Sequence, residues 1–152
     1  MPAMRLYAHY RSSTSYRVRI ALGLKGLDYE VVPVDLLASE QRNDAFRARN
    51  PFAGAPCLEF DGRFYAQSMA IIEWLDERFP QPPLLPGDPE QRFVAREAAQ
   101  AIASELHAPL NLPVLRYLKR ELGHDQSSID TWYRHWLVWC RFSGQDAKLI
   151  PT

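Results

Sequence analysis

Three hydroxyl side chains follow one another where a short apolar-polar alternation gives way to a helical pattern: Ser12, Ser13 and Thr14. The first amides of a helix and the positive end of its dipole favour an anion, and they lower the pKa of a thiol held beside them. This cluster therefore points to a site for a thiolate or another small anion. The alternative is that the hydroxyls only cap the helix, the usual role of such residues at a helix start.

Two further positions could bind a ligand. Pro56 stands between a loop and a strand, and a cis Ala55-Pro56 bond would offer the amide and carbonyl of Ala55 to an extended, peptide-like ligand. The alternative is a trans proline that only starts the strand. Gln67 and Ser68 begin a later helix, where their donors suit a carboxylate or serve as an ordinary cap.

The elements that must position these residues follow from periodicity. Alternation over residues 5–10 predicts a strand, and apolar residues at helical spacing predict a helix that ends at Leu24, with Gly26 in a left-handed conformation after it. Residues 29–35 read as a second strand, which Pro33 places at an edge of the sheet.

The next elements have clear capping and turn signals. Ser39 is a candidate cap for a helix through Arg49, and residues 57–60 and 63–66 flank Asp61-Gly62, a favoured two-residue hairpin turn. A helix then runs to Phe79. The order β-α-β-α-β-β-α predicts an α/β domain with a mixed sheet, which brings the three candidate ligand-binding positions to one end.

Residues 81–89 contain four prolines and read as a stiff connector, after which the pattern is helical, with helices beginning near Glu90, Leu110 and Ser127. Ser127 to Asp130 resembles a capping box. We therefore expect a domain at 1–80, a linker at 81–89 and an all-helical domain at 90–152.

Composition narrows the function classes. The chain has 152 residues, 47% of them hydrophobic, and its 18 basic and 18 acidic residues cancel to a net charge of +0. Without a positive field, nucleic acid is not an expected partner. The only cysteines, Cys57 and Cys140, lack the spacing of a disulfide framework or a zinc site, so we expect no metal and a reducing, cytoplasmic setting. No stretch is apolar enough to span a membrane.

The motifs together resemble the zeta class of glutathione transferases. The resemblance runs from about Met4 to Leu137, and its most specific part is the run Ser12-Ser13-Thr14-Ser15-Tyr16-Arg17-Val18-Arg19-Ile20-Ala21. Other matching motifs, some shared across many transferases, are Asn50-Pro51, Ala55-Pro56, Asp61-Gly62 and Gln67-Ser68. The resemblance implies a thioredoxin-like N-terminal domain that binds glutathione, followed by an all-helical domain. Because the likeness fades after Leu137, that second domain is expected to be partial and the chain truncated.

The resemblance also implies roles for individual residues. Ser12 would donate a hydrogen bond that keeps the glutathione sulfur ionised, and Ala55 would bind the cysteinyl backbone. Gln67 and Ser68 would hold the γ-glutamyl carboxylate. Further expected glutathione contacts are Ser13, Thr14, Gln41, His107 and Asn111.

The activity implied is glutathione-dependent cis-trans isomerisation of small unsaturated dicarboxylates such as maleylacetoacetate, in aromatic amino-acid or related catabolism, by a homodimer. Arg11, beside Ser12, is the candidate partner for a substrate carboxylate, and a solvated surface arginine is its alternative. A second hypothesis is a glutathione-binding or interaction module that lacks catalysis. A thioredoxin-type redox protein is disfavoured, because serines stand where a reactive cysteine would be required.

Overall fold

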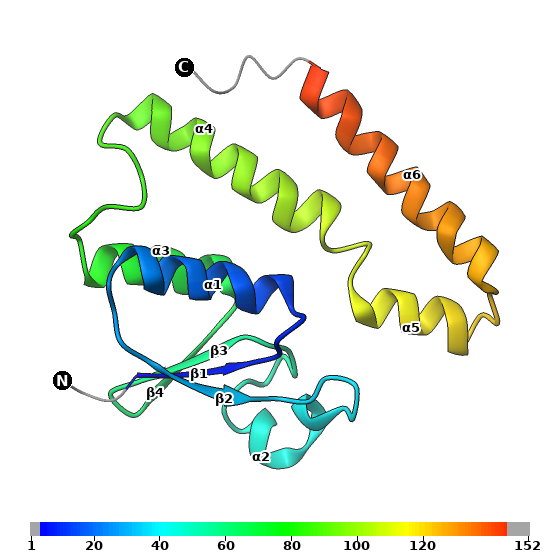
Figure 1. Ribbon diagram of the computed structural model, residues 1–152, viewed down its shortest axis with the longest axis horizontal. Coiled ribbons are helices and arrows are strands. Elements are labelled where there is room, and N and C mark those ends of the chain that lie inside the picture. Colours follow the sequence, from blue (N-terminus) through cyan, green and yellow to red (C-terminus); the bar gives the residue numbers. More distant parts are fainter. Residues whose placement is uncertain (1–3, 146–152) are drawn as a thin grey trace. The chain divides into compact units, whose positions relative to one another are not determined.

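The computed structural model describes residues 4–145, with their side chains up to Leu137. It divides into two compact units, Met1–Leu85 and Pro86–Thr152, which are described here one at a time. The division falls inside the proline-rich stretch 81–89. Figure 1 shows that the first unit contains all the strands and that the second is helical.

The first unit is built on a four-stranded sheet with the order β2-β1-β3-β4. Its strands are β1 (Arg5–Ala8), β2 (Glu30–Pro33), β3 (Cys57–Phe60) and β4 (Arg63–Ala66). β1 and β2 are parallel, whereas β3 is antiparallel to both β1 and β4. This is the mixed sheet that the sequence predicts. Pro33 lies in an edge strand as expected. It has no amide proton to donate, and an edge strand tolerates this because only one of its sides pairs with another strand.

Helices cover both faces of this sheet. α1 (Ser13–Leu24) and α3 (Ser68–Arg78) lie on one face, and the short α2 (Asp44–Arg47) lies on the other (Figure 1). The alternation in β1 explains both contacts: Leu6 belongs to the core cluster under α1 and α3, and Tyr7 to a smaller cluster with Phe46 of α2. The thioredoxin-like order β-α-β-α-β-β-α is therefore confirmed.

Two predicted turns are confirmed by their backbone angles. Gly26 has a φ of 63° after the end of α1. Asp61 and Gly62, between β3 and β4, have φ values of 52° and 72°, so both take the left-handed conformation that a two-residue hairpin of this twist requires.

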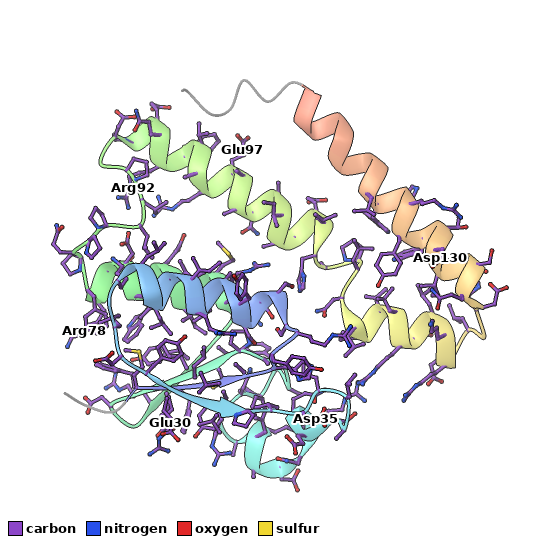
Figure 2. The ribbon with its side chains drawn as sticks, in the orientation of Figure 1. Glu30, Asp35, Arg78, Arg92, Glu97 and Asp130 are labelled. Carbon is purple, nitrogen blue, oxygen red and sulfur yellow. The ribbon has the colours of Figure 1, made fainter. Side chains whose placement is uncertain are left out.

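The predicted helix from Ser39 to Arg49 is wrong. The segment forms a 3-10 turn (Glu40–Arg42) and the single turn of α2, and Ser39 itself has a φ of 63° with no capping bond. Two capping side chains divide this part of the chain. The carboxylate of Asp35, which follows β2 (Figure 2), accepts the amides of the residues two and three positions later. Inside the predicted helix, Asn43 is extended, with a ψ of 157°, and its Oδ1 accepts the amide of Phe46 at 2.7 Å, so it ends the 3-10 turn and starts α2 as a separate helix.

The second unit consists of α4 (Pro89–Gln100), a π-helical turn (Ala101–Leu106), α5 (Leu112–Arg120) and α6 (Gln126–Gln145). Each predicted helix is present with its start shifted by one or two residues, and the π-helical turn was not predicted. α6 is capped by Asp125, whose Oδ1 accepts the amide of Ser128 at 2.8 Å, and not by Ser127 as predicted.

A buried lysine ties the first unit together. The side chain of Lys25, just after α1, is 0% exposed, and its ammonium contacts Asp76 of α3 at 2.5 Å. It also donates to the carbonyls of Phe79 and Pro82, each at 2.7 Å. Asp76 in turn accepts the amide of Leu84 at 2.8 Å. The Lys25 clamp, as we call this set, joins the ends of α1 and α3 to the proline-rich segment, with every ammonium proton used.

Candidate active site

The strand register places three chain segments at one end of the sheet. Tyr7 of β1 pairs with Cys57 of β3, and Cys57 pairs with Ala66 of β4. Both pairings are antiparallel, so the segments after β1 and β4 and the segment before β3 meet at the same end. These segments carry Ser12, Ala55 and Gln67.

Ser12 caps α1 and remains linked to the opposite loop. Its Oγ accepts the amide of Ser15 at 3.1 Å and lies 2.7 Å from Oγ1 of Thr14. Thr14 donates to the carbonyl oxygen of Ala55 at 2.9 Å. Ser12 therefore caps the helix, as the alternative interpretation of the hydroxyl cluster predicts. It also belongs to a hydrogen-bonded set that reaches the loop before β3.

The loop before β3 is held from inside by Asn50. This side chain is 2% exposed, donates to the carbonyl of Gly54 and accepts the amide of Phe52 at 3.0 Å. The Ala55-Pro56 peptide bond is cis, as the ligand-binding interpretation of this position requires. From the sequence alone, Asn50 is expected only to end a helix. The signal that was available is an asparagine whose side chain can satisfy the backbone of a tight loop.

Gln67 has an unusual backbone at the start of α3. Its φ of 69° and ψ of 108° lie in a region that residues other than glycine rarely adopt, and its exposed side chain does not cap the helix. The ordinary cap proposed as its alternative is therefore wrong. Ser68, the first residue of α3, is buried. Backbone outliers of this kind cluster at binding sites, where the surrounding structure holds them.

Gln41 has a buried side-chain oxygen with an open hydrogen-bonding position. The residue is 7% exposed, and its Oε1 makes no hydrogen bond within residues 4–145. A buried acceptor without a donor is costly, so a ligand that supplied an N–H group here would recover that cost. The segment leading to Gln41 starts at the same end of the sheet, where the amide of Val34 donates to the carbonyl of Ala8 at 2.9 Å.

The other predicted site residues are not part of the hydrogen-bonded set of Ser12, Thr14 and Ala55. Arg11 and Ser13 flank Ser12 and are exposed. His107 follows the π-helical turn, and Asn111 caps α5 through its Oδ1, which accepts the amide of Leu112 at 2.8 Å. His107 and Asn111 belong to the second unit, and their contacts with a ligand of the first unit remain predictions.

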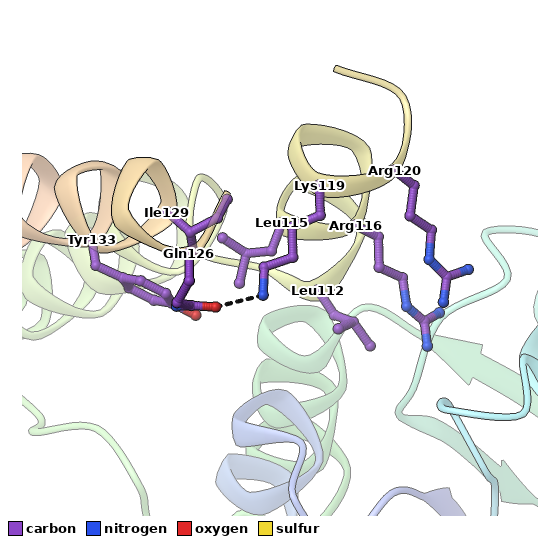
Figure 3. A pocket seen from close by; sticks show the side chains of 8 residues that line it. All are labelled: Leu112, Leu115, Arg116, Lys119, Arg120, Gln126, Ile129 and Tyr133. Carbon is purple, nitrogen blue, oxygen red and sulfur yellow. Dashed lines mark hydrogen bonds between the residues drawn. The ribbon is translucent and has the colours of Figure 1, made fainter. Parts of the chain in front are cut away.

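A pocket of about 290 Å³ lies in the second unit between α5 and α6 (Figure 3). Arg116 and Arg120 point to the same side of α5, and Lys119 donates to Gln126 of α6 at 2.6 Å. The complete lining is Leu112, Leu115, Arg116, Lys119, Arg120, Gln126, Ile129 and Tyr133. None of the predicted site residues lines it, so we place the candidate site at the sheet end of the first unit.

Cys57 lies at the start of β3 but is not a reactive thiol. The residue is buried, and burial raises the pKa of its thiol to about 11. In the part of the chain that the structure describes, no three His, Cys, Asp or Glu residues gather where they could hold a metal ion. Among the helices that the structure describes, none is both long enough and apolar enough to cross a membrane.

Comparison with known protein families matches residues 6–83, just over half of the chain, to the N-terminal domain of glutathione S-transferases. The chain belongs to the glutathione S-transferase family. The matched range contains α1, α3 and all of the sheet except Arg5, and therefore every first-unit residue of the candidate site.

Similarity to known proteins places this glutathione transferase in the zeta class. It is 47% identical over 137 residues to the maleylacetoacetate isomerase of Pseudomonas aeruginosa, covering 88% of this chain and 64% of the relative. A bacterial zeta-class maleylpyruvate isomerase has a solved structure with a TM-score of 0.85 and 41% identity, over 88% of this chain and 63% of that one.

A third relative has ligands in its solved structure. The maleylacetoacetate isomerase of Methylobacterium extorquens AM1, with bound malonate and glutathione, has a TM-score of 0.83 and 36% identity, covering 88% of this chain and 63% of its own. The chain thus spans less than two thirds of the length of each of these three relatives.

Proposed function

We propose that this zeta-class transferase binds glutathione at the sheet end of its first unit and that Ser12 holds the glutathione sulfur as a thiolate. The observation that carries the proposal is the hydrogen-bonded set of Ser12, Thr14 and Ala55, which joins a helix start to the loop before β3. A hydroxyl donor and a helix dipole both favour the charged form of a thiol and so lower its pKa.

The donor set at this end of the sheet fits glutathione. Ala55 would pair its amide and carbonyl with the cysteinyl backbone, and Gln67 and Ser68 would hold the γ-glutamyl carboxylate at the start of α3. The buried oxygen of Gln41 fits a ligand N–H group. Ser13, with His107 and Asn111 of the second unit, would supply further contacts.

We propose glutathione-dependent cis-trans isomerisation of a maleylacetoacetate-type dicarboxylate as the reaction. Bound glutathione supplies a nucleophilic sulfur that adds to the double bond and later leaves, and rotation about the single bond in between changes cis to trans. Ser12 keeps its proton throughout and lowers the pKa of that sulfur. Arg11 is an exposed cation beside Ser12 and would pair with a substrate carboxylate. We also propose a homodimer, which sedimentation velocity would detect.

Calorimetric titration with glutathione, together with an isomerisation assay on the same sample, tests this function. We expect saturable binding at one site per chain and turnover of maleylacetoacetate that requires glutathione. Binding of glutathione without turnover would contradict the isomerase assignment, and the absence of binding would contradict the whole proposal.

The second candidate is a glutathione-binding module without catalysis. The observation that favours it is that most of the residues proposed to bind glutathione lie in the first unit, within the range that matches the N-terminal domain of glutathione S-transferases. The same pair of measurements separates the two candidates, because the module would bind glutathione but leave the isomerisation rate at its uncatalysed value.

A further inference from the structure

Hydrogen counting fixes the direction of the bonds around Thr14. A threonine hydroxyl has one proton, and Thr14 donates it to the carbonyl of Ala55 at 2.9 Å. The 2.7 Å contact between Thr14 and Ser12 must therefore be donated by Ser12. Because Ser12 also accepts the amide of Ser15, the bonds run in one direction, from Ser15 through Ser12 and Thr14 to Ala55. We call this the hydroxyl chain.

The hydroxyl chain spans two groups that would contact the same part of the ligand. Under the proposed function, Ser12 binds the sulfur and the backbone of Ala55 binds the rest of the cysteinyl residue. These two positions are 43 residues apart in the sequence, and Thr14 contacts both through a single oxygen atom. A hydroxyl in this place sets the distance between the sulfur-binding donor and the backbone that aligns the cysteine.

We propose that Thr14 is a positioning residue, which orients Ser12 and holds Ala55 so that a bound cysteinyl thiol lies on the Ser12 hydroxyl. The inference rests on the proposed function and replaces the direct glutathione contact expected of Thr14. Without a ligand, Thr14 accepts the proton of Ser12. With a thiolate bound, Ser12 turns the same proton to the sulfur in a charge-assisted bond, and Thr14 turns its own proton to the remaining lone pair of Ser12 Oγ. The cysteinyl N–H of the ligand then takes the place of Thr14 on the carbonyl of Ala55, and each hydroxyl keeps its own proton.

Substitutions at Thr14 separate the hydroxyl from the shape of the side chain. Thr14→Val keeps the branched shape and removes the hydroxyl, whereas Thr14→Ser keeps the hydroxyl and removes a methyl group. Thr14→Ala provides a second variant without a hydroxyl if Thr14→Val folds poorly. The readout is the pKa of bound glutathione, obtained from the ultraviolet absorbance of the thiolate as pH is varied.

We expect Thr14→Val and Thr14→Ala to raise the pKa of the bound thiol by about one unit, which means about tenfold less thiolate below that pKa. Thr14→Ser should keep the wild-type value. An unchanged pKa in both variants that lack the hydroxyl would overturn the role of Thr14 while leaving the proposed function intact, and so would a Thr14→Ser value equal to that of Thr14→Val. Absence of a bound thiolate in the wild-type protein would overturn the proposed function and the role of Thr14 together.

Discussion

At the scale of single residues, Ser12 serves structure and chemistry with different parts of one hydroxyl group. Its oxygen accepts the amide of Ser15 and so caps α1, and its proton goes to Thr14 and is available to a ligand. The two roles predict different consequences for two small substitutions. Glycine is a tolerable N-cap and alanine is a poor one, but neither can donate to a sulfur.

We therefore expect Ser12→Ala to lower the free energy of unfolding by about 1 kcal/mol and Ser12→Gly by only a few tenths. Both variants should lower the isomerisation turnover number by about 100-fold, as expected when a donor to a reacting anion is removed. Urea unfolding and steady-state kinetics on the same preparations check this. Turnover that followed stability, with Ser12→Gly near the wild type, would show that Ser12 acts only as a cap.

Cys57 provides a second prediction at this scale. Burial raises the pKa of its thiol from the ordinary 9.0 to about 11, so almost none of it is thiolate at pH 8. We expect the folded protein to resist iodoacetamide at Cys57 at pH 8 and to react as the pH approaches about 11. Peptide mass spectrometry locates the label, and the same protein in urea is the control, where the thiol should react readily at pH 8. Rapid labelling of the folded protein at pH 8 would contradict the prediction.

The candidate site was predictable where it depends on local chemistry and not where it depends on tertiary contacts. Hydroxyls at a helix start, the proline before β3 and the start of α3 stand in the sequence as recognisable types. The bond from Thr14 to Ala55 joins positions 41 residues apart, and nothing local to either residue specifies it. The positive φ of Gln67 was equally hidden, since glutamine has no preference for that conformation.

At the scale of elements, the difference between a correct and a wrong prediction is whether the signal was complete within a few residues. Asp61-Gly62 has the backbone preference that its turn needs, so the hairpin of β3 and β4 is as predicted. The stretch from Ser39 to Arg49 has helical composition, but an extended Asn43 caps α2 in the middle of it, so the chain forms two short turns and no continuous helix. Hydrophobic periodicity does not register such a cap.

The Lys25 clamp is the element-scale feature with the largest expected effect on stability. We expect Lys25→Met to lower the free energy of unfolding by about 3–5 kcal/mol, because it removes the positive charge beside the Asp76 carboxylate and leaves two carbonyls without the ammonium donor. Lys119→Met, at an exposed lysine of α5, is the matched control and should cost less than about 1 kcal/mol. Chemical unfolding measures both. Equal losses in the two variants would mean that the clamp does not hold the first unit together.

At the scale of the whole molecule, the buried apolar residues are unevenly divided between the two units. Among the described side chains, Ile129 is the only buried apolar residue of the second unit, and the other buried apolar residues all belong to the first. The first unit also has the Lys25 clamp at the ends of its helices. We therefore expect local unfolding to cost more free energy in the first unit than in the second.

Hydrogen exchange monitored by mass spectrometry should show this division. We expect amides of β1, β3 and α1 to exchange at least about 100-fold more slowly than those of α4 and α5, since few buried apolar contacts hold the latter. Addition of glutathione should slow exchange in the loop before β3 and at the start of α3. Uniform protection along residues 4–145 would contradict the expected difference between the units.

The hairpin turn at Asp61-Gly62 offers a practical use of the sheet's polarity. Both residues are exposed and lie at the end of β3 and β4 opposite Ala55 and Gln67. A cysteine-reactive dye or a tether to a sensor chip, attached through a residue introduced at Asp61, would leave the proposed glutathione site facing free solution. The protein could in this way be immobilised in one orientation with its ligand-binding end open to the flow.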